Sequence, residues 1–86
     1  MRIVWDRDAR HDYVWWQSQD RKILRRINTL VEDVVRNGNE GIGKPEPLKH
    51  AFAGYWSRRI NDEHRLVYRA LDDEVRIAAC RYHYGR

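Results

Sequence analysis

An apolar stripe with helical spacing runs through residues 23–34 and constrains the fold more than any other part of the sequence. Six side chains make up this stripe: Ile23, Leu24, Ile27, Leu30, Val31 and Val34. Their spacing places them on one face of an α-helix, because 3.6 residues make one turn. We therefore predict a helix that begins after Asp20, a suitable N-cap, and ends at Asn37-Gly38.

The segment before this helix predicts a short strand and then a first helix. Ile3-Val4-Trp5 has the character of a strand, and Asp6 is a suitable N-cap for a helix that begins after it. Three residues share one face of this helix, which we expect to end near Gln19: Ala9, Tyr13 and Trp16. Trp15 and Trp16 cannot both face one core, so we expect one of them to be exposed, as is typical of a protein interface.

The second half of the chain is rich in β-branched and aromatic residues, which favour strands. Three strands are expected there: Tyr55–Ile60, His64–Leu71 and Glu74–Tyr84. Residues 37–47, with their Gly, Asn and Pro, predict a surface loop. Helices first and strands afterwards predict one α+β domain over residues 1–86, with two N-terminal helices packed on one face of a small, mainly antiparallel β-sheet.

The loop between the first two predicted strands decides which side chains share the open face of that sheet. A three-residue loop over residues 61–63 turns Trp56 and Ile60 toward the helices. A two-residue loop would instead pair Ile60 with Arg65 and distribute the apolar side chains over both faces of the sheet. The longer loop gathers three arginines on the opposite face: Arg59, Arg65 and Arg69. Guanidinium groups beside aromatic rings bind phosphodiester backbones and stack bases. A solvated face whose charges prevent edge aggregation is the alternative.

Charge and cysteine content narrow the classes of function. The chain carries 17 Lys and Arg against 13 Asp and Glu. The excess lies mainly in residues 44–86, which favours a polyanionic ligand there. One cysteine, Cys80, excludes an internal disulfide, and the four histidines are not spaced as metal ligands, so we expect neither a metal nor another cofactor. No apolar run approaches the roughly 18 residues that span a bilayer, so we expect a cytoplasmic protein without a membrane partner.

Two side chains suit acid–base chemistry. Glu46 lies between Pro45 and Pro47, whose fixed φ angles stiffen the backbone and hold the carboxylate still for work as a general base. A rigid surface turn is the alternative explanation of this motif. His83 lies among polar aromatic residues near the chain end, and imidazole is the natural proton donor near neutral pH. A ring that simply packs on a neighbour at a strand end is the alternative there.

Four segments in order resemble the YoeB-type toxins of the RelE/ParE superfamily. They are Gly43-Lys-Pro-Glu-Pro-Leu-Lys-His50, Gly54-Tyr-Trp-Ser-Arg-Arg-Ile60, Glu63-His-Arg-Leu-Val-Tyr68 and Ile77-Ala-Ala-Cys-Arg-Tyr-His-Tyr84. The likeness runs over residues 1–84 and is densest after Gly43. It implies the RelE-like microbial RNase fold and the toxin of a type II toxin–antitoxin system. The implied activity is a ribosome-dependent, metal-independent mRNA endoribonuclease that cleaves in the A site and inhibits translation.

The resemblance also implies site residues and partners. Glu46 would take the proton of the attacking 2′-hydroxyl, Arg65 would stabilise the phosphoryl charge, and His83 would protonate the leaving 5′-oxygen. Three further residues match substrate-binding positions: Lys49, Arg59 and Tyr84. The implied partners are the ribosome, mRNA, a YefM-like antitoxin whose acidic segment covers the basic face, and a second copy of the chain.

The chain departs from the family pattern at its end and leaves a second function open. The pattern ends at the tyrosine that matches Tyr84, whereas Gly85 and Arg86 follow here and displace the terminal carboxylate. Because every proposed side chain is present, we predict an active enzyme. The alternatives are a non-catalytic inhibitor that binds RNA or the ribosome through the basic face alone, and a corepressor of a DNA-binding antitoxin.

Overall fold

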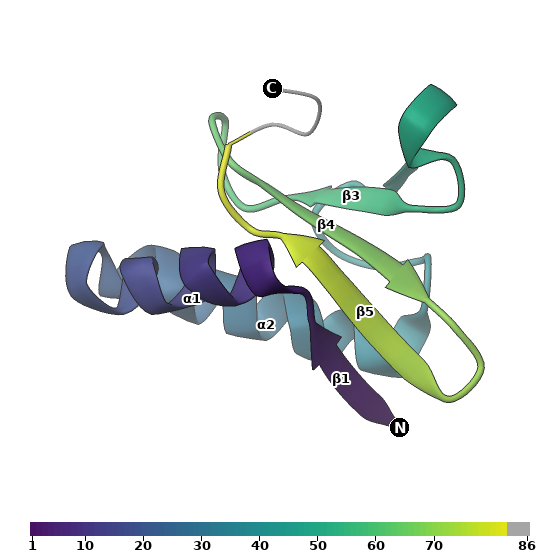
Figure 1. Ribbon diagram of the computed structural model, residues 1–86, viewed down its shortest axis with the longest axis horizontal. Helices are drawn as coiled ribbons and strands as arrows, with labels where there is room; N and C mark the ends of the chain where they lie inside the picture. The colour runs from purple at the N-terminus through teal and green to yellow at the C-terminus, as the bar shows by residue number, and fades with distance from the viewer. Residues whose placement is uncertain (83–86) are drawn as a thin grey trace.

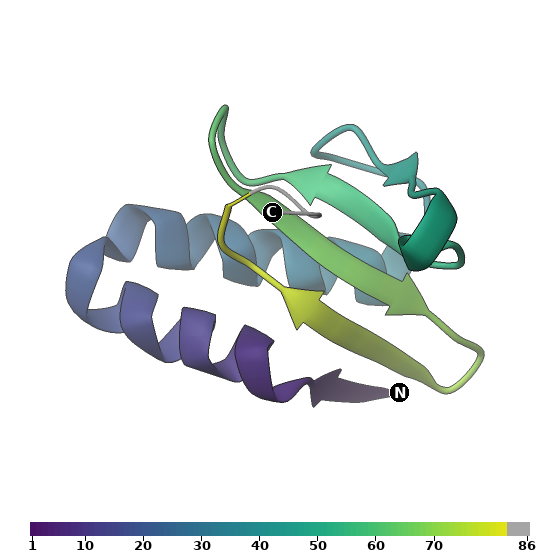
Figure 2. The ribbon, with the colours of Figure 1, turned by 45° about the horizontal axis from the view of Figure 1, so that its top comes forward.

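Two helices lie side by side against one face of a five-stranded sheet in the computed structural model, which describes residues 1–82 (Figure 1). The elements in chain order are β1 (Arg2–Trp5), α1 (Arg7–Gln19), α2 (Arg21–Asn37), β2 (Glu46–Pro47), the 3₁₀ turn η1 (His50–Phe52), β3 (Trp56–Arg59), β4 (Arg65–Ala70) and β5 (Glu74–Ala79). Figure 2 shows α1 and α2 on one side of the sheet, and within residues 1–82 neither of these helices covers the opposite face, which we call the open face. The predicted α+β fold class is confirmed.

The sheet is mixed, with strand order β1-β5-β4-β3-β2. β1 pairs with β5 in parallel, and the remaining neighbours are antiparallel. The N-terminal strand therefore lies at one edge beside the last strand in the chain. The sheet is mainly antiparallel, as predicted.

The helices begin and end where the sequence predicts. Asp20 caps α2, because its Oδ1 accepts hydrogen bonds from the N–H groups of Lys22 and Ile23, at 3.0 and 3.2 Å. Gly38 comes directly after the helix with a φ of 64°, a conformation that glycine adopts without strain. Asp6 stands at the N-cap of α1 but makes no capping bond, since its carboxylate accepts from Arg76 instead, at 3.0 Å.

The core lies between the helices and the sheet. α1 and α2 contribute Ala9, Trp16, Ile27, Leu30, Val31 and Val34, and the strands contribute Leu66, Tyr68, Val75 and Ile77. The stripe predicted on the second helix supplies four of these residues, which is why α2 packs so closely on the sheet. Among residues 1–82, the structure contains no helix with the length and apolar character that crossing a bilayer requires.

The register of the first hairpin agrees with the three-residue loop. Trp56 pairs with Tyr68, and Arg59 pairs with Arg65. Both members of a directly opposed pair project from the same side of a sheet. Trp56 therefore faces the helices, and the two arginines share the open face.

Two strand predictions need correction. Within residues 37–47, Glu46 and Pro47 are not loop, because they pair with β3 as the short strand β2. The third predicted strand is correct only as far as Ala79 in the described part of the chain. Beyond it the backbone N–H of Cys80 donates to Asp12 on α1, at 3.2 Å, and Tyr82 has a φ of 61°. A left-handed residue cannot continue a strand.

Candidate functional site on the open face

The pairing of three strands brings a carboxylate and two guanidinium groups to the open face. Glu46 on β2 pairs with Ser57 on β3, and Arg59 on β3 pairs with Arg65 on β4. Ser57 and Arg59 are two residues apart, so they project from the same side of their strand. Glu46, Arg59 and Arg65 therefore line one surface, as the sequence predicts for the two arginines.

Glu46 is exposed and stands at the end of a loop that a buried arginine holds in place. The Arg58 side chain is fully buried beneath β3. Its guanidinium donates to three loop carbonyls: Gly38 at 2.7 Å, Glu40 at 3.0 Å and Ile42 at 3.1 Å. Arg59 adds a backbone bond from its N–H to the Gly43 carbonyl, at 2.7 Å. Residues 38–43 are thus tied to the sheet just before Glu46.

The same guanidinium joins the loop to the core. It forms an ion pair with Asp33 on α2, and its Nε donates to the Tyr68 hydroxyl at 3.2 Å. The hydrogen bond from Arg58 lowers the pKa of Asp33 below its ordinary value. Asp33 in turn accepts the N–H of Ile42 at 3.1 Å. This network was not predicted, although the register that turns Trp56 toward the helices also turns Arg58 that way.

Gly43 is required where the loop passes over the core. Its φ is 82°, and a Cβ there would lie 2.8 Å from the Cδ2 atom of Leu30. Any side chain would therefore push the loop away from α2. This close approach sets the path of the chain into the stiff Pro45-Glu46-Pro47 segment.

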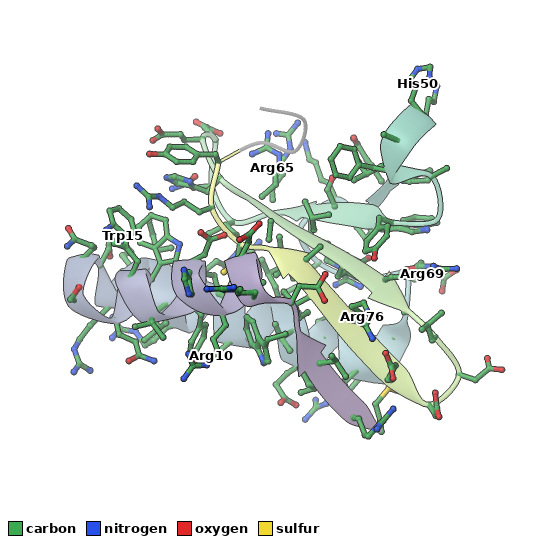
Figure 3. The ribbon with its side chains drawn as sticks, viewed as in Figure 1. Arg10, Trp15, His50, Arg65, Arg69 and Arg76 are labelled. Carbon is green, nitrogen blue, oxygen red and sulfur yellow. The ribbon has the colours of Figure 1, made fainter. Side chains whose placement is uncertain are left out.

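Arg65 is half-buried and partly committed to the hairpin loop. Its Nη1 donates to the carbonyls of Asn61, Asp62 and His64, at 2.7, 3.3 and 3.1 Å. Its Nε and Nη2 have no hydrogen-bond partner within residues 1–82. The Nη1 bonds therefore fix the orientation of the guanidinium, whose other nitrogens bind no residue from 1 to 82, and Figure 3 shows the Arg65 side chain at the start of β4.

His64 holds the end of the described chain against Arg65. Its Nδ1 accepts the N–H of Tyr82 at 2.7 Å, and the Tyr82 carbonyl accepts the N–H of Arg65 at 3.0 Å. The buried imidazole packs edge to face on Trp16, with ring centroids 4.8 Å apart. Because Nδ1 accepts the hydrogen bond from the Tyr82 N–H, the ring in this arrangement carries its hydrogen on Nε2. His64 was not among the predicted site residues, and no local pattern reveals this contact.

The remaining predicted residues are placed as follows. Lys49 is exposed at the start of η1, on the chain that leaves β2, whereas His83 and Tyr84 lie outside the described residues. The tryptophan expected to be exposed is not: Trp16 is buried, and Trp15 is half-buried beneath Arg81 with the guanidinium 3.5 Å from its ring centroid. Within residues 1–82 no three His, Cys, Asp or Glu residues cluster as metal ligands.

Comparisons with known proteins identify the family to which the chain belongs. Residues 5–84 match the family model described as a YoeB-like toxin of bacterial type II toxin–antitoxin systems. The toxin YoeB of Escherichia coli (strain K12) is 54% identical over 84 residues, which cover 98% of this chain and 100% of that protein.

Two solved structures from Staphylococcus aureus have the same fold over nearly their whole length. A YoeB dimer is 49% identical with a TM-score of 0.91, and a YoeB–YefM complex is 48% identical with a TM-score of 0.90. Each match covers 98% of both chains. The chain belongs to the YoeB-like family of toxins from bacterial type II toxin–antitoxin systems.

Proposed function

We propose that this chain is a ribosome-dependent mRNA endoribonuclease that cleaves in the A site and so inhibits translation. The observation that carries the proposal is the convergence of Glu46, Arg59 and Arg65 on the open face of a YoeB-like fold. A carboxylate beside two guanidinium groups offers a base and an anion site within one surface. Cleavage of an RNA phosphodiester by its own 2′-hydroxyl needs both of these from a protein, together with an acid that protonates the leaving 5′-oxygen.

The proposed reaction uses the substrate's own hydroxyl as nucleophile. Glu46 accepts the 2′-hydroxyl proton while the 2′-oxygen bonds to phosphorus. The P–O5′ bond then breaks, and His83 donates a proton to the leaving 5′-oxygen. The products are a 2′,3′-cyclic phosphate, which water opens to a 3′-phosphate, and a 5′-hydroxyl. Proton transfers of this kind contribute roughly 10²- to 10⁴-fold each.

The cationic residues bind and stabilise the phosphate in this scheme. Arg65 lies nearest the hairpin loop, and its Nε and Nη2 face the developing charge on the phosphoryl oxygens. Arg59, directly opposite, holds the same phosphate. Lys49 and Tyr84 bind and orient the RNA. No metal or other cofactor enters any step of the proposal.

We further propose a YefM-like antitoxin and a second copy of the chain as protein partners. The Staphylococcus aureus relatives, one solved as a dimer and one with YefM, support both partners. An acidic antitoxin segment laid over Arg59 and Arg65 would neutralise the anion site. The toxin would then be inactive in the complex because its phosphate-binding groups are occupied.

The test is mRNA cleavage in a purified translation system, with and without ribosomes, and with both ends of each cut mapped. Wild type is compared with Glu46→Gln, with the Glu46→Ala/His83→Ala double variant, and with Glu32→Gln as a matched control on the exposed face of α2. We expect A-site cuts with a 5′-hydroxyl for wild type and Glu32→Gln only. Stalled synthesis with intact mRNA would overturn the nuclease and favour inhibition by binding alone.

Metal independence needs its own measurement, because ribosomes require Mg²⁺. A phosphorothioate at the scissile phosphate weakens Mg²⁺ coordination more than Mn²⁺ coordination. We expect Mn²⁺ not to rescue cleavage of this substrate. Rescue by Mn²⁺ would contradict the proposed mechanism.

A further inference from the structure

We propose that Arg69 and Tyr55 form a second RNA subsite on the open face, which binds a nucleotide that flanks the cleaved position. The inference rests on the proposed function, since it takes the ligand to be a single RNA strand laid along this face. It adds a binding site of its own, with an arginine for the phosphate and an aromatic ring for the base.

The subsite lies on the far side of Glu46 from the two arginines of the candidate site. Arg69 comes four residues after Arg65 on β4, so it projects from the same face about 13 Å further along the strand. Figure 3 shows Arg65 and Arg69 at opposite ends of β4. Tyr55 precedes Ser57, the partner of Glu46, by two residues. The order along the face is therefore an arginine pair, a carboxylate, and then Arg69 with Tyr55.

Arg69 carries the uncompensated positive charge at this end of the sheet. It stands directly opposite Arg76 on β5, and two like charges in that position repel. Arg76 is neutralised by Asp6 and Glu74, at 3.0 and 3.3 Å. Arg69 is exposed and forms no ion pair with any residue from 1 to 82. Its charge remains available to an anion from solvent.

Tyr55 supplies the aromatic part of the subsite. The Arg69 guanidinium carbon lies 5.9 Å from the centre of the half-buried Tyr55 ring. The backbone here is held in place because the Tyr55 carbonyl accepts the N–H of Leu48 at 2.9 Å. A planar guanidinium that lies over an aromatic ring offers an unpaired base a stacking surface, whatever the identity of the base.

Gly54 keeps this stacking surface accessible. Its φ is 94°, which favours glycine, and a Cβ there would lie 3.7 Å from the Arg69 guanidinium carbon. A longer side chain at residue 54 would therefore cover the arginine. The charge of Arg69 alone would suit an acidic peptide as well as RNA. The ring beside it favours RNA, because a carboxylate makes no use of a stacking surface.

The test measures the affinity of short single-stranded RNAs by fluorescence anisotropy. The probes are two to eight nucleotides long and carry 2′-O-methyl groups, so that no cleavage occurs. Wild type is compared with Arg69→Gln and with Arg25→Gln, which removes the same charge from an exposed position on α2. Tyr55→Leu removes the ring, and Tyr55→Phe retains it. Thermal denaturation verifies that each variant is folded.

We expect Arg69→Gln to weaken binding of the longer RNAs about tenfold and to leave the dinucleotide unaffected. The slope of log affinity against log salt should fall by about 0.7, the value for one phosphate of a single strand. Tyr55→Leu should weaken the same RNAs without changing the slope, while Tyr55→Phe and Arg25→Gln bind as wild type does.

Two results would overturn the subsite. One is equal affinity of Arg69→Gln and Arg25→Gln for every RNA. The other is a loss confined to an acidic antitoxin peptide, which would make this surface part of the antitoxin interface. The cleavage assay of the wild type is independent of both results. If the wild type cuts mRNA but Arg69→Gln has no length-dependent effect on RNA affinity, the proposed function stands and only the proposed subsite is refuted.

Discussion

The guanidinium of Arg58 and the carboxylate of Asp33 form an ion pair that fastens the loop before Glu46 to helix α2. Replacing Arg58 by Met should lower the free energy of unfolding by about 1–3 kcal/mol, because three loop carbonyls and the partly exposed carboxylate of Asp33 lose their buried donor. Urea denaturation measures this change.

Arg58→Lys is the control, since it retains the charge but cannot reach all of these acceptors. We expect a stability between those of wild type and Arg58→Met. A loss below about 1 kcal/mol for the Met variant would show that the loop is held by other contacts.

The two perturbed carboxylates predict opposite effects of pH on stability. The hydrogen bond from Arg58 lowers the pKa of Asp33, so its stabilising contribution is present above about pH 4 and is lost as the pH falls through that lowered pKa. Burial raises the pKa of Asp12, so the charged form of Asp12 costs stability at neutral pH, and the cost disappears on acidification.

Asparagine variants test these signs. Asp33→Asn should be less stable than wild type at pH 7 and should lose less stability between about pH 5 and pH 2. Asp12→Asn should be at least as stable as wild type at pH 7, since its amide oxygen still accepts the N–H of Cys80. Urea midpoints of unfolding across this pH range measure both effects. If both substitutions change the midpoint at pH 7 in the same direction, the opposite roles given to the two carboxylates are refuted.

If the hydrogen bond that His64 accepts from Tyr82 matters for cleavage, a variant that retains this bond should cleave mRNA faster than variants that only fill the same space. The substitution His64→Asn places an amide oxygen near the position of Nδ1, where it can accept the Tyr82 N–H, whereas Gln and Leu at this position cannot. We expect His64→Asn to cleave mRNA at near wild-type rate, and His64→Gln and His64→Leu to be slower by about tenfold or more, because His83 adjoins Tyr82. Single-turnover rates at saturating ribosomes report this step. Equal cleavage rates for the Asn and Gln variants would show that His64 contributes through packing and not through the hydrogen bond from Tyr82.

The buried thiol of Cys80 should react slowly with alkylating reagents in the folded protein. Its thiol is fully buried, its Sγ lies 3.7 Å from the Ala9 carbonyl oxygen, and burial raises its pKa. Alkylation by iodoacetamide at pH 8 should be at least about 10³-fold slower in the folded protein than in urea, since it requires unfolding. Rapid labelling without denaturant would reveal local opening around residues 80–82.

The helices and the first hairpin were predictable because each depends on a pattern within a short stretch of sequence. The stripe that ends at Val34 identifies α2 without reference to any other element, and Asp20 marks its start. The register of β3 and β4 follows from one requirement, that Trp56 and Ile60 face a core. The position of Arg59 opposite Arg65 on the open face follows from the same requirement.

The rest depends on contacts between distant segments. β2 has two residues and exists only because β3 offers it a partner, so nothing in Glu46-Pro47 alone predicts a strand. The contacts of Arg58 could not be predicted because its five acceptors lie in a helix, a loop and a strand that are far apart in the sequence. The bond from Tyr82 to His64 likewise joins residues 18 apart. The roles of Glu46, Arg65 and His83 in catalysis stay predictions.

The parallel pairing of β1 with β5 has a consequence for synthesis. Arg2 and Glu74, which are paired residues joined by a salt bridge, are separated by 72 positions in the chain. β1 therefore cannot pair before β5 has been synthesised. A nascent chain that lacks β5 also lacks the part of the core that β5 contributes against the helices. Such long-range pairing forms late and slowly. The chain therefore completes its fold only after β5 has been made, so the full five-stranded sheet and its open face are not assembled while the segments before β5 are still being added.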